Sequence, residues 1–165
     1  MNMKNIITQH LINRIYKQSE EKFLKSLKDS GTSRDLVNIV QWFSRQEKLT
    51  TEKMSCLCYF LYSWELACFN KEIAPFKFIK KNGKLYERAI LEVYGEGGEI
   101  PNITLDELEF DEHTQAALNA IWQLYGKLSE EELLSRITVQ DPFIEADPYL
   151  SPKSICLFFL SVIFG

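Results

Sequence analysis

The stretch at residues 50–69, TTEKMSCLCYFLYSWELACF, decides the fold. It opens with Thr50, a residue suited to cap a helix, and places Glu52 in the first turn, where a carboxylate complements the helix dipole. Beyond that turn apolar side chains fall on every side of a helix, so no polar face is left for solvent. A helix of this kind belongs in the middle of a domain. We therefore expect a buried central helix with the other helices packed around it.

Upstream of this stretch the chain predicts two more helices. Apolar residues recur at three- and four-residue steps over 4–28, and the helix face opposite them is mildly basic. Gly31 ends that helix, and Thr32 or Ser33 can cap the next one. A second stripe then runs to about Gln46, carried by Leu36, Ile39, Val40 and Phe43.

Downstream, cap residues predict where three helices begin. Asp111 caps a helix that ends at Gly126, and Ser129 with Glu132 forms a capping box for the next one. A cap also precedes proline at Asp141-Pro142 and at Ser151-Pro152. The second of these starts a terminal helix, whose inward face we expect to be formed by Ile155, Phe158, Phe159 and Val162.

Helical periodicity is lost just after the central stretch. Pro75, the short run at 76–79 and the turn-like Asn82-Gly83 predict an extended arm or hairpin near residues 72–84. Helical spacing then returns, and glycines at 95–98 end the helix; its apolar positions are Leu85, Tyr86, Ala89, Ile90 and Val93. A further capping-box pattern at 104–107 predicts one short helical turn.

The chain has 165 residues, of which 45% are apolar and few are glycine or proline. This composition excludes a disordered, collagen-like or disulfide-stapled chain. We expect a single, compact, mainly α domain at residues 32–165, preceded by an amphipathic extension at 1–31.

Charge is unevenly distributed along the chain. The formal net charge is −4, yet residues 89–126 hold eight acidic side chains and no Lys or Arg, so the rest carries −4 − (−8) = +4. This balance disfavours a strongly basic nucleic-acid binder. Three interpretations of the acidic block from Glu92 to Glu112 stay open: an electrostatic dock for a basic protein, a mimic that fends off nucleic acid, and a solvated surface.

Cysteine use and the chain's first residues predict a cytoplasmic location. Cys56 and Cys58 lie among apolar neighbours and two residues apart, which favours free buried thiols over a disulfide or metal site. Residues 1–8 lack signal-peptide order, and the longest apolar run, at 155–164, is far shorter than the ~20 residues of a membrane span.

The residues predict no enzymatic site and no cofactor. There is no phosphate-binding glycine loop, and the two histidines, His10 and His113, are remote from each other and from any cysteine pair, which argues against a metal site. Apolar neighbours would raise the pKa of Cys56 and Cys58 and so weaken them as nucleophiles. The acidic run at 130–132 lies at a helix start, where it complements the dipole, and His113 is interpreted as a surface residue of its helix.

A basic and aromatic stretch at 76–88 is the candidate partner-binding site. Aromatic rings interleaved with cations can stack on single-stranded bases and neutralise phosphates, although a segment alternating between core and solvent has the same pattern. The candidate residues are Phe76, Phe78, Lys80, Lys81, Lys84, Tyr86 and Arg88.

Four motifs follow one another along the chain: Leu36-Val-Asn-Ile-Val-Gln-Trp-Phe43, Leu49-Thr-Thr-Glu-Lys-Met54 with Leu57-Cys-Tyr-Phe60, Ala120-Ile-Trp-Gln-Leu-Tyr-Gly126 and Asp141-Pro-Phe143. Together they resemble the Panacea domain, which is shared by SocA-like antitoxins and phage-associated GepA-like proteins. The likeness runs from about Thr32 to Phe164. Lys80-Lys81-Asn82-Gly83 replaces the family's Gly-Pro-Val turn, Val139 its frequent histidine, and Cys56 its second lysine.

The resemblance implies a non-enzymatic antitoxin that binds and neutralises a cognate toxin, in some members as a proteolytic adaptor. Three alternatives stay open: a phage or mobile-element protein that interferes with a host complex, a weak nucleic-acid binder, and an enzyme with a site shared with a partner. The extension at 1–31 lies outside the resemblance and could serve a homodimer.

Overall fold

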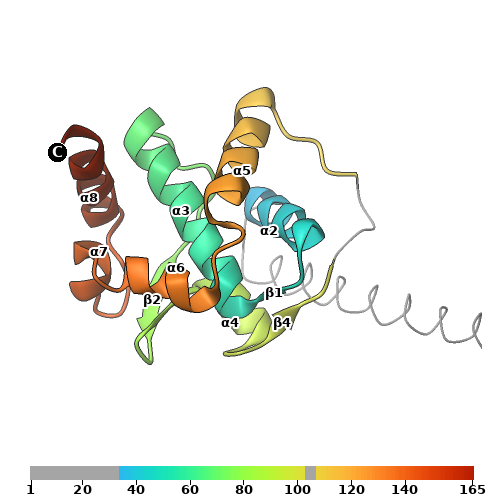
Figure 1. The fold of residues 1–165 in the computed structure, drawn as a ribbon, viewed down its shortest axis with the longest axis horizontal. Coiled ribbons are helices and arrows are strands. Elements are labelled where there is room, and N and C mark those ends of the chain that lie inside the picture. Colours follow the sequence, from blue (N-terminus) through green and yellow to red (C-terminus); the bar gives the residue numbers. More distant parts are fainter. Residues whose placement is uncertain (1–33, 103–106) are drawn as a thin grey trace, which may run out of the picture.

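A computed structural model of the chain describes residues 34–102 and 107–165 (Figure 1). Over these ranges the chain forms seven helices and two pairs of short strands, so the mainly α prediction holds. The helix expected at 4–28, the cap at Thr32 or Ser33 and the turn expected at 104–107 lie wholly or partly outside the described residues.

The helix expected at 50–69 is present as α3 (Thr51–Phe69), and thirteen of its 19 residues are buried. Thr50 caps it as predicted, because its Oγ1 accepts a hydrogen bond of 3.1 Å from the backbone N–H of Lys53. Asn70, in the left-handed conformation with φ of 50°, ends the helix. Elements from both halves of the chain contact α3, including α2 (Arg34–Gln46), α5 (Glu112–Tyr125), α6 (Glu130–Ile137) and α8 (Pro152–Phe164).

Predicted caps begin three of the later helices. Asp111 accepts from the N–H of Thr114 at the start of α5, Ser129 from that of Glu132 at α6, and Ser151 from that of Ser154 at α8. The start of α7 (Asp141–Ile144) corrects the prediction, because its N-cap is Gln140 and Asp141 is already helical. The side chain of Gln140 makes no cap bond; its Oε1 instead accepts from the hydroxyl of Tyr59 at 2.6 Å, inside the core.

The arm is a β-hairpin formed by β2 (Phe78–Lys81) and β3 (Lys84–Glu87), which pair in antiparallel register. Asn82 and Gly83 both have positive φ, 52° and 73°, as a two-residue primed turn requires. The helical spacing read at Leu85 and Tyr86 was wrong, because both residues lie on β3 and the following helix, α4 (Arg88–Tyr94), begins only after Glu87. As part of a strand, Leu85 and Tyr86 pair with residues of β2, and both of their side chains are buried.

A second, unpredicted strand pair anchors the acidic loop. β1 (Leu49–Thr50) pairs with β4 (Glu99–Ile100), immediately before the start of α3. Two further bonds support the pairing: the N–H of Thr51 donates to the carbonyl of Gly98, and that of Gly97 donates to the buried carboxylate of Glu52. The loop after α4 is therefore held against the N-terminal end of α3.

Aromatic rings fill the core between α3, the hairpin and the C-terminal helices. The ring of Tyr59 meets Phe60, Phe78 and Phe159 edge-on, with centroids 5.4 to 5.9 Å apart. Phe60 stacks on Tyr125 of α5 at 4.0 Å. Residues from α3, β2, α5 and α8 thus meet in one cluster, which holds the arm and the last helix in place.

Candidate functional site

The aromatic residues of the candidate site belong to the core. Phe76, Phe78 and Tyr86 are only 4%, 2% and 2% exposed, so their rings do not form an exposed binding face. Tyr62 of α3 contacts both phenylalanine rings edge-on. The alternation of aromatic and basic residues therefore reflects a segment with one face in the core and the other in solvent.

Most of the arm's cations are engaged within the chain. Lys81 pairs with Glu96 at 3.9 Å, Lys84 with Glu130 at 3.9 Å, and Arg88 with Glu92 at 3.2 Å. The ammonium of Lys80 lies 4.9 Å from the ring centroid of Phe143. Part of the acidic block thus lies against the arm and offsets its positive charge. A count of charges along the sequence could not reveal this pairing.

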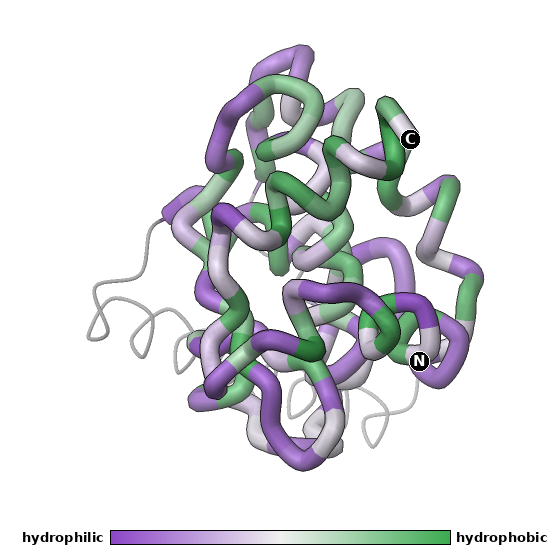
Figure 2. The backbone as a smooth tube through the Cα atoms, turned by 90° about the vertical axis from the view of Figure 1, so that its left-hand side faces the viewer, coloured by the Kyte–Doolittle hydropathy of each residue, from purple (hydrophilic) through white to green (hydrophobic). Residues whose placement is uncertain are grey.

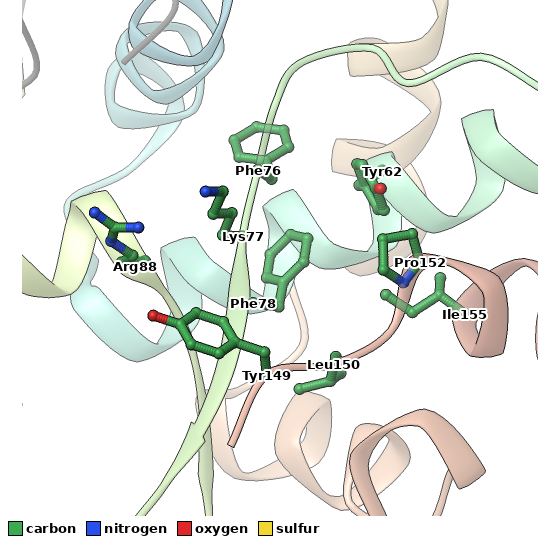
Figure 3. Close-up of a pocket in the computed structure, with 9 residues that line it drawn as sticks. All are labelled: Tyr62, Phe76, Lys77, Phe78, Arg88, Tyr149, Leu150, Pro152 and Ile155. Carbon is green, nitrogen blue, oxygen red and sulfur yellow. The ribbon is translucent and has the colours of Figure 1, made fainter. Parts of the chain in front are cut away.

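The arm also borders a pocket of about 450 Å³ (Figure 3). Phe76, Phe78 and Arg88 of the predicted site line it, whereas Lys80, Lys81, Lys84 and Tyr86 do not. The remaining lining residues come from the arm, from α3, from the segment before α8 and from the start of α8; they are Lys77, Tyr62, Tyr149, Leu150, Pro152 and Ile155. Residues far apart in the sequence therefore meet at this pocket.

A second surface, at α7 and α8, was missed by sequence reasoning. Of nine large apolar side chains exposed among the described residues, seven lie between residues 139 and 164. Leu157, Val162 and Phe164 on α8 are 58%, 54% and 83% exposed. Figure 2 shows the hydrophobic colour of the chain beside its C-terminus. The expected inward face of α8 holds only at Ile155 and Phe159, because Phe158 is half-buried and Val162 is exposed.

A groove of about 450 Å³ runs between α7 and the side of α8 that carries Leu157. Its lining includes Leu157 and Phe158 of α8 and the carboxyl groups of Asp141 and Glu145 at the two ends of α7, with Lys153 the one cation among its lining residues. We call this groove, together with the exposed Leu157 and Phe164, which lie two turns apart on one side of α8, the α7–α8 surface. It combines an apolar strip with a net negative edge.

Two other groups of residues considered as chemical candidates are buried thiols and a histidine paired with a carboxylate. Burial raises the pKa of the Cys56 and Cys58 thiols well above their usual value, so both stay protonated near neutral pH. Nε2 of His113 lies 2.6 Å from the carboxylate of Glu65, and the imidazole contacts the ring of Phe69 edge-on. No cluster of His, Cys, Asp or Glu that could hold a metal ion occurs in the described part of the chain. No helix within the same ranges is both long and apolar enough to cross a bilayer.

The burial of the thiols predicts their reactivity. In the folded protein we expect Ellman's reagent to react quickly with Cys68, which is exposed, and more slowly with the half-buried Cys156. Cys56 and Cys58 should react only after unfolding, because the thiolate attacks and both groups are buried and protonated. The Cys68→Ser variant should lose the fast phase; a fast phase that persists in it would contradict this assignment.

Searches against protein-family models, curated proteins and solved structures returned no significant match.

Proposed function

We propose that the chain is a non-enzymatic protein-binding module, an antitoxin-like protein that binds and neutralises a cognate toxin, with or without delivering it to a protease. The antitoxin class comes from the resemblance to the Panacea domain. The observation that carries a protein-binding role is the α7–α8 surface, where Leu157 and Phe164 stand in solvent two turns apart on one side of α8. Apolar clusters of this kind mark interaction sites in water-soluble proteins.

The chemistry of the surface specifies the kind of partner. Leu157 and Phe158 offer an apolar strip, and Asp141 and Glu145 border it with two carboxylates against the single ammonium of Lys153. An amphipathic helix with an apolar face and Lys or Arg along one edge complements both features. We therefore assign the occupant as such a helix on the toxin.

A nucleic-acid-binding role has less support. Contacts to phosphates need cations that are free to replace counterions. Lys81, Lys84 and Arg88 already face carboxylates of this chain, and the aromatic rings that would stack on bases are buried. The arm is therefore a poor surface for binding single-stranded nucleic acid.

Co-expression with the product of the adjacent gene tests the proposal. We expect that product alone to arrest growth, the wild-type chain to restore growth, and the two proteins to co-elute in size-exclusion chromatography. Leu157→Glu should weaken the complex about thirtyfold, because burying a carboxylate in an apolar contact costs about 2 kcal/mol. Growth rescue should then fail.

A matched variant controls for non-specific effects. Leu124 of α5 is 65% exposed and lies outside the α7–α8 surface, so Leu124→Glu should rescue growth as the wild type does. Circular dichroism and the unfolding midpoint should be the same for both variants and the wild type. If the wild-type chain neither restored growth nor co-eluted with the product of the adjacent gene, the proposal would be overturned.

A further inference from the structure

The pocket beside the arm has an apolar end built from rings and aliphatic side chains. Phe76 and Phe78 are almost fully buried and present their rings to it, and Tyr62 turns its hydroxyl away to Glu72, donating at 3.2 Å. Pro152 and Ile155, at the start of α8, complete this end. A wall of this composition favours an aromatic or branched apolar group.

The opposite end of the pocket carries two cationic side chains, Lys77 and Arg88. Figure 3 shows the ammonium of Lys77, the guanidinium of Arg88 and the hydroxyl of Tyr149 on one side, with Tyr62, Pro152 and Ile155 on the other. Lys77 makes no ion pair with any described residue. Arg88 uses its Nε for Glu92, which leaves the terminal amino groups as donors. Two carboxylates stand beside these cations, Glu92 at Arg88 and the buried Glu87 at the backbone of Lys77, so this end is close to neutral overall and offers the Lys77 ammonium and the Arg88 terminal amino groups as available donors.

Backbone hydrogen bonds hold both walls of the pocket in place. The N–H of Leu150 donates to the carbonyl of Phe78 at 3.0 Å, and that of Lys80 to Pro148 at 2.8 Å, so the segment before α8 is bound to β2. The N–H of Arg88 donates to the carbonyl of Lys77 at 2.8 Å, which joins the two cationic residues. The pocket is therefore formed before any ligand arrives, and little ordering cost opposes binding.

We propose that this pocket binds a carboxylate carried on a compact apolar body, with the apolar group against Phe76 and Phe78 and the carboxylate between Lys77 and Arg88. The hydroxyl of Tyr149 donates a further hydrogen bond to the same carboxylate. A volume of about 450 Å³ lies within the range of pockets that hold small organic ligands. This site is separate from the α7–α8 surface, and the inference does not depend on the antitoxin role.

Two-dimensional ¹H–¹⁵N NMR titration of the full chain tests the inference, with 3-phenylpropionate as the probe and its neutral amide as the comparison. We expect the acid to shift signals of residues 76–78, 88 and 149–155 in a saturable way. The amide should bind about fivefold more weakly, because it lacks the ion pair. Equal affinity of acid and amide, or no saturable shift up to about 10 mM acid, would overturn the proposal.

Charge-removing variants locate the carboxylate. Lys77→Gln and Arg88→Gln should each weaken acid binding about fivefold while leaving amide binding unchanged. Lys127→Gln, an exposed lysine outside the pocket, should alter neither. An equal loss in Lys127→Gln would contradict a specific site.

A peptide ending in phenylalanine, tested with a free and with an amidated C-terminus, distinguishes the source of the carboxylate. Binding of the free-carboxylate peptide as well as the acid assigns the pocket to a chain terminus. Binding of the acid alone assigns it to a free small molecule.

Discussion

Replacing Tyr59 with alanine is expected to lower the free energy of unfolding by about 4 kcal/mol, as for other large aromatic side chains deleted from a core. Tyr59 is fully buried, and its ring meets Phe60, Phe78 and Phe159. Deletion leaves a cavity among rings from α3, β2 and α8, and the rigid helix backbone cannot close it. The substitution also removes the hydroxyl that donates a buried hydrogen bond to Gln140.

Urea unfolding followed by circular dichroism measures this loss, and Tyr59→Phe is the matched control. The phenylalanine variant keeps the ring contacts and removes only the hydroxyl that donates to Gln140 at 2.6 Å. It should therefore lose about 1 to 2 kcal/mol, the cost of one unsatisfied buried polar group. A loss below about 1 kcal/mol in Tyr59→Ala would show that the aromatic cluster does not organise the core.

The second large effect is expected at Glu87, where Glu87→Ala should cost about 3 kcal/mol. This carboxylate is 1% exposed and accepts from three backbone N–H groups, those of Lys77 at 2.9 Å, Ala89 at 2.7 Å and Ile90 at 3.2 Å. It thus ties the chain before β2 to the first turn of α4. Its removal leaves these three backbone N–H groups without an acceptor in a region that water reaches poorly.

Comparison with Glu87→Gln across pH checks the role of the charge. Burial raises the pKa of Glu87 above its usual value of 4.5, and the three backbone donors only partly offset this. The folded state then holds the proton more tightly than the unfolded state. Wild-type stability relative to Glu87→Gln should be greatest below pH 4.5 and decline as pH rises through the raised pKa. Urea unfolding of both proteins over that range measures the difference; a relative stability that rises with pH would contradict it.

Local signals predicted the helices well where a cap and a stripe agreed. Asp111 and Ser129 each precede a run that can bury one side, Thr50 precedes a run that is apolar on every side, and each of the three accepts the hydrogen bond expected of a cap. Leu85 and Tyr86 were misassigned because their spacing continues that of Ala89, Ile90 and Val93 on the following helix, and two positions are too few to separate a helical period from a strand. The deciding influence was the primed turn at Asn82 and Gly83, which requires a paired strand on both sides.

The candidate sites were harder to predict because they depend on distant residues. Spacing places Val162 on the same side of α8 as Ile155 and Phe159, but it cannot show whether another element covers that turn. The pairing of Lys84 with Glu130 joins residues 46 positions apart, so the arm looked more basic in the sequence than it is when folded. The pocket likewise combines α3, the arm and the segment before α8.

Amide hydrogen exchange of the chain, alone and saturated with the product of the adjacent gene, tests the central claim most directly, because it locates the contact without any substitution. Exchange should slow at residues 141–145 and 157–164, which form the α7–α8 surface, and stay unchanged in the β2–β3 hairpin. Slower exchange in the hairpin with unchanged exchange in α8 would contradict the account and return the partner to the basic arm.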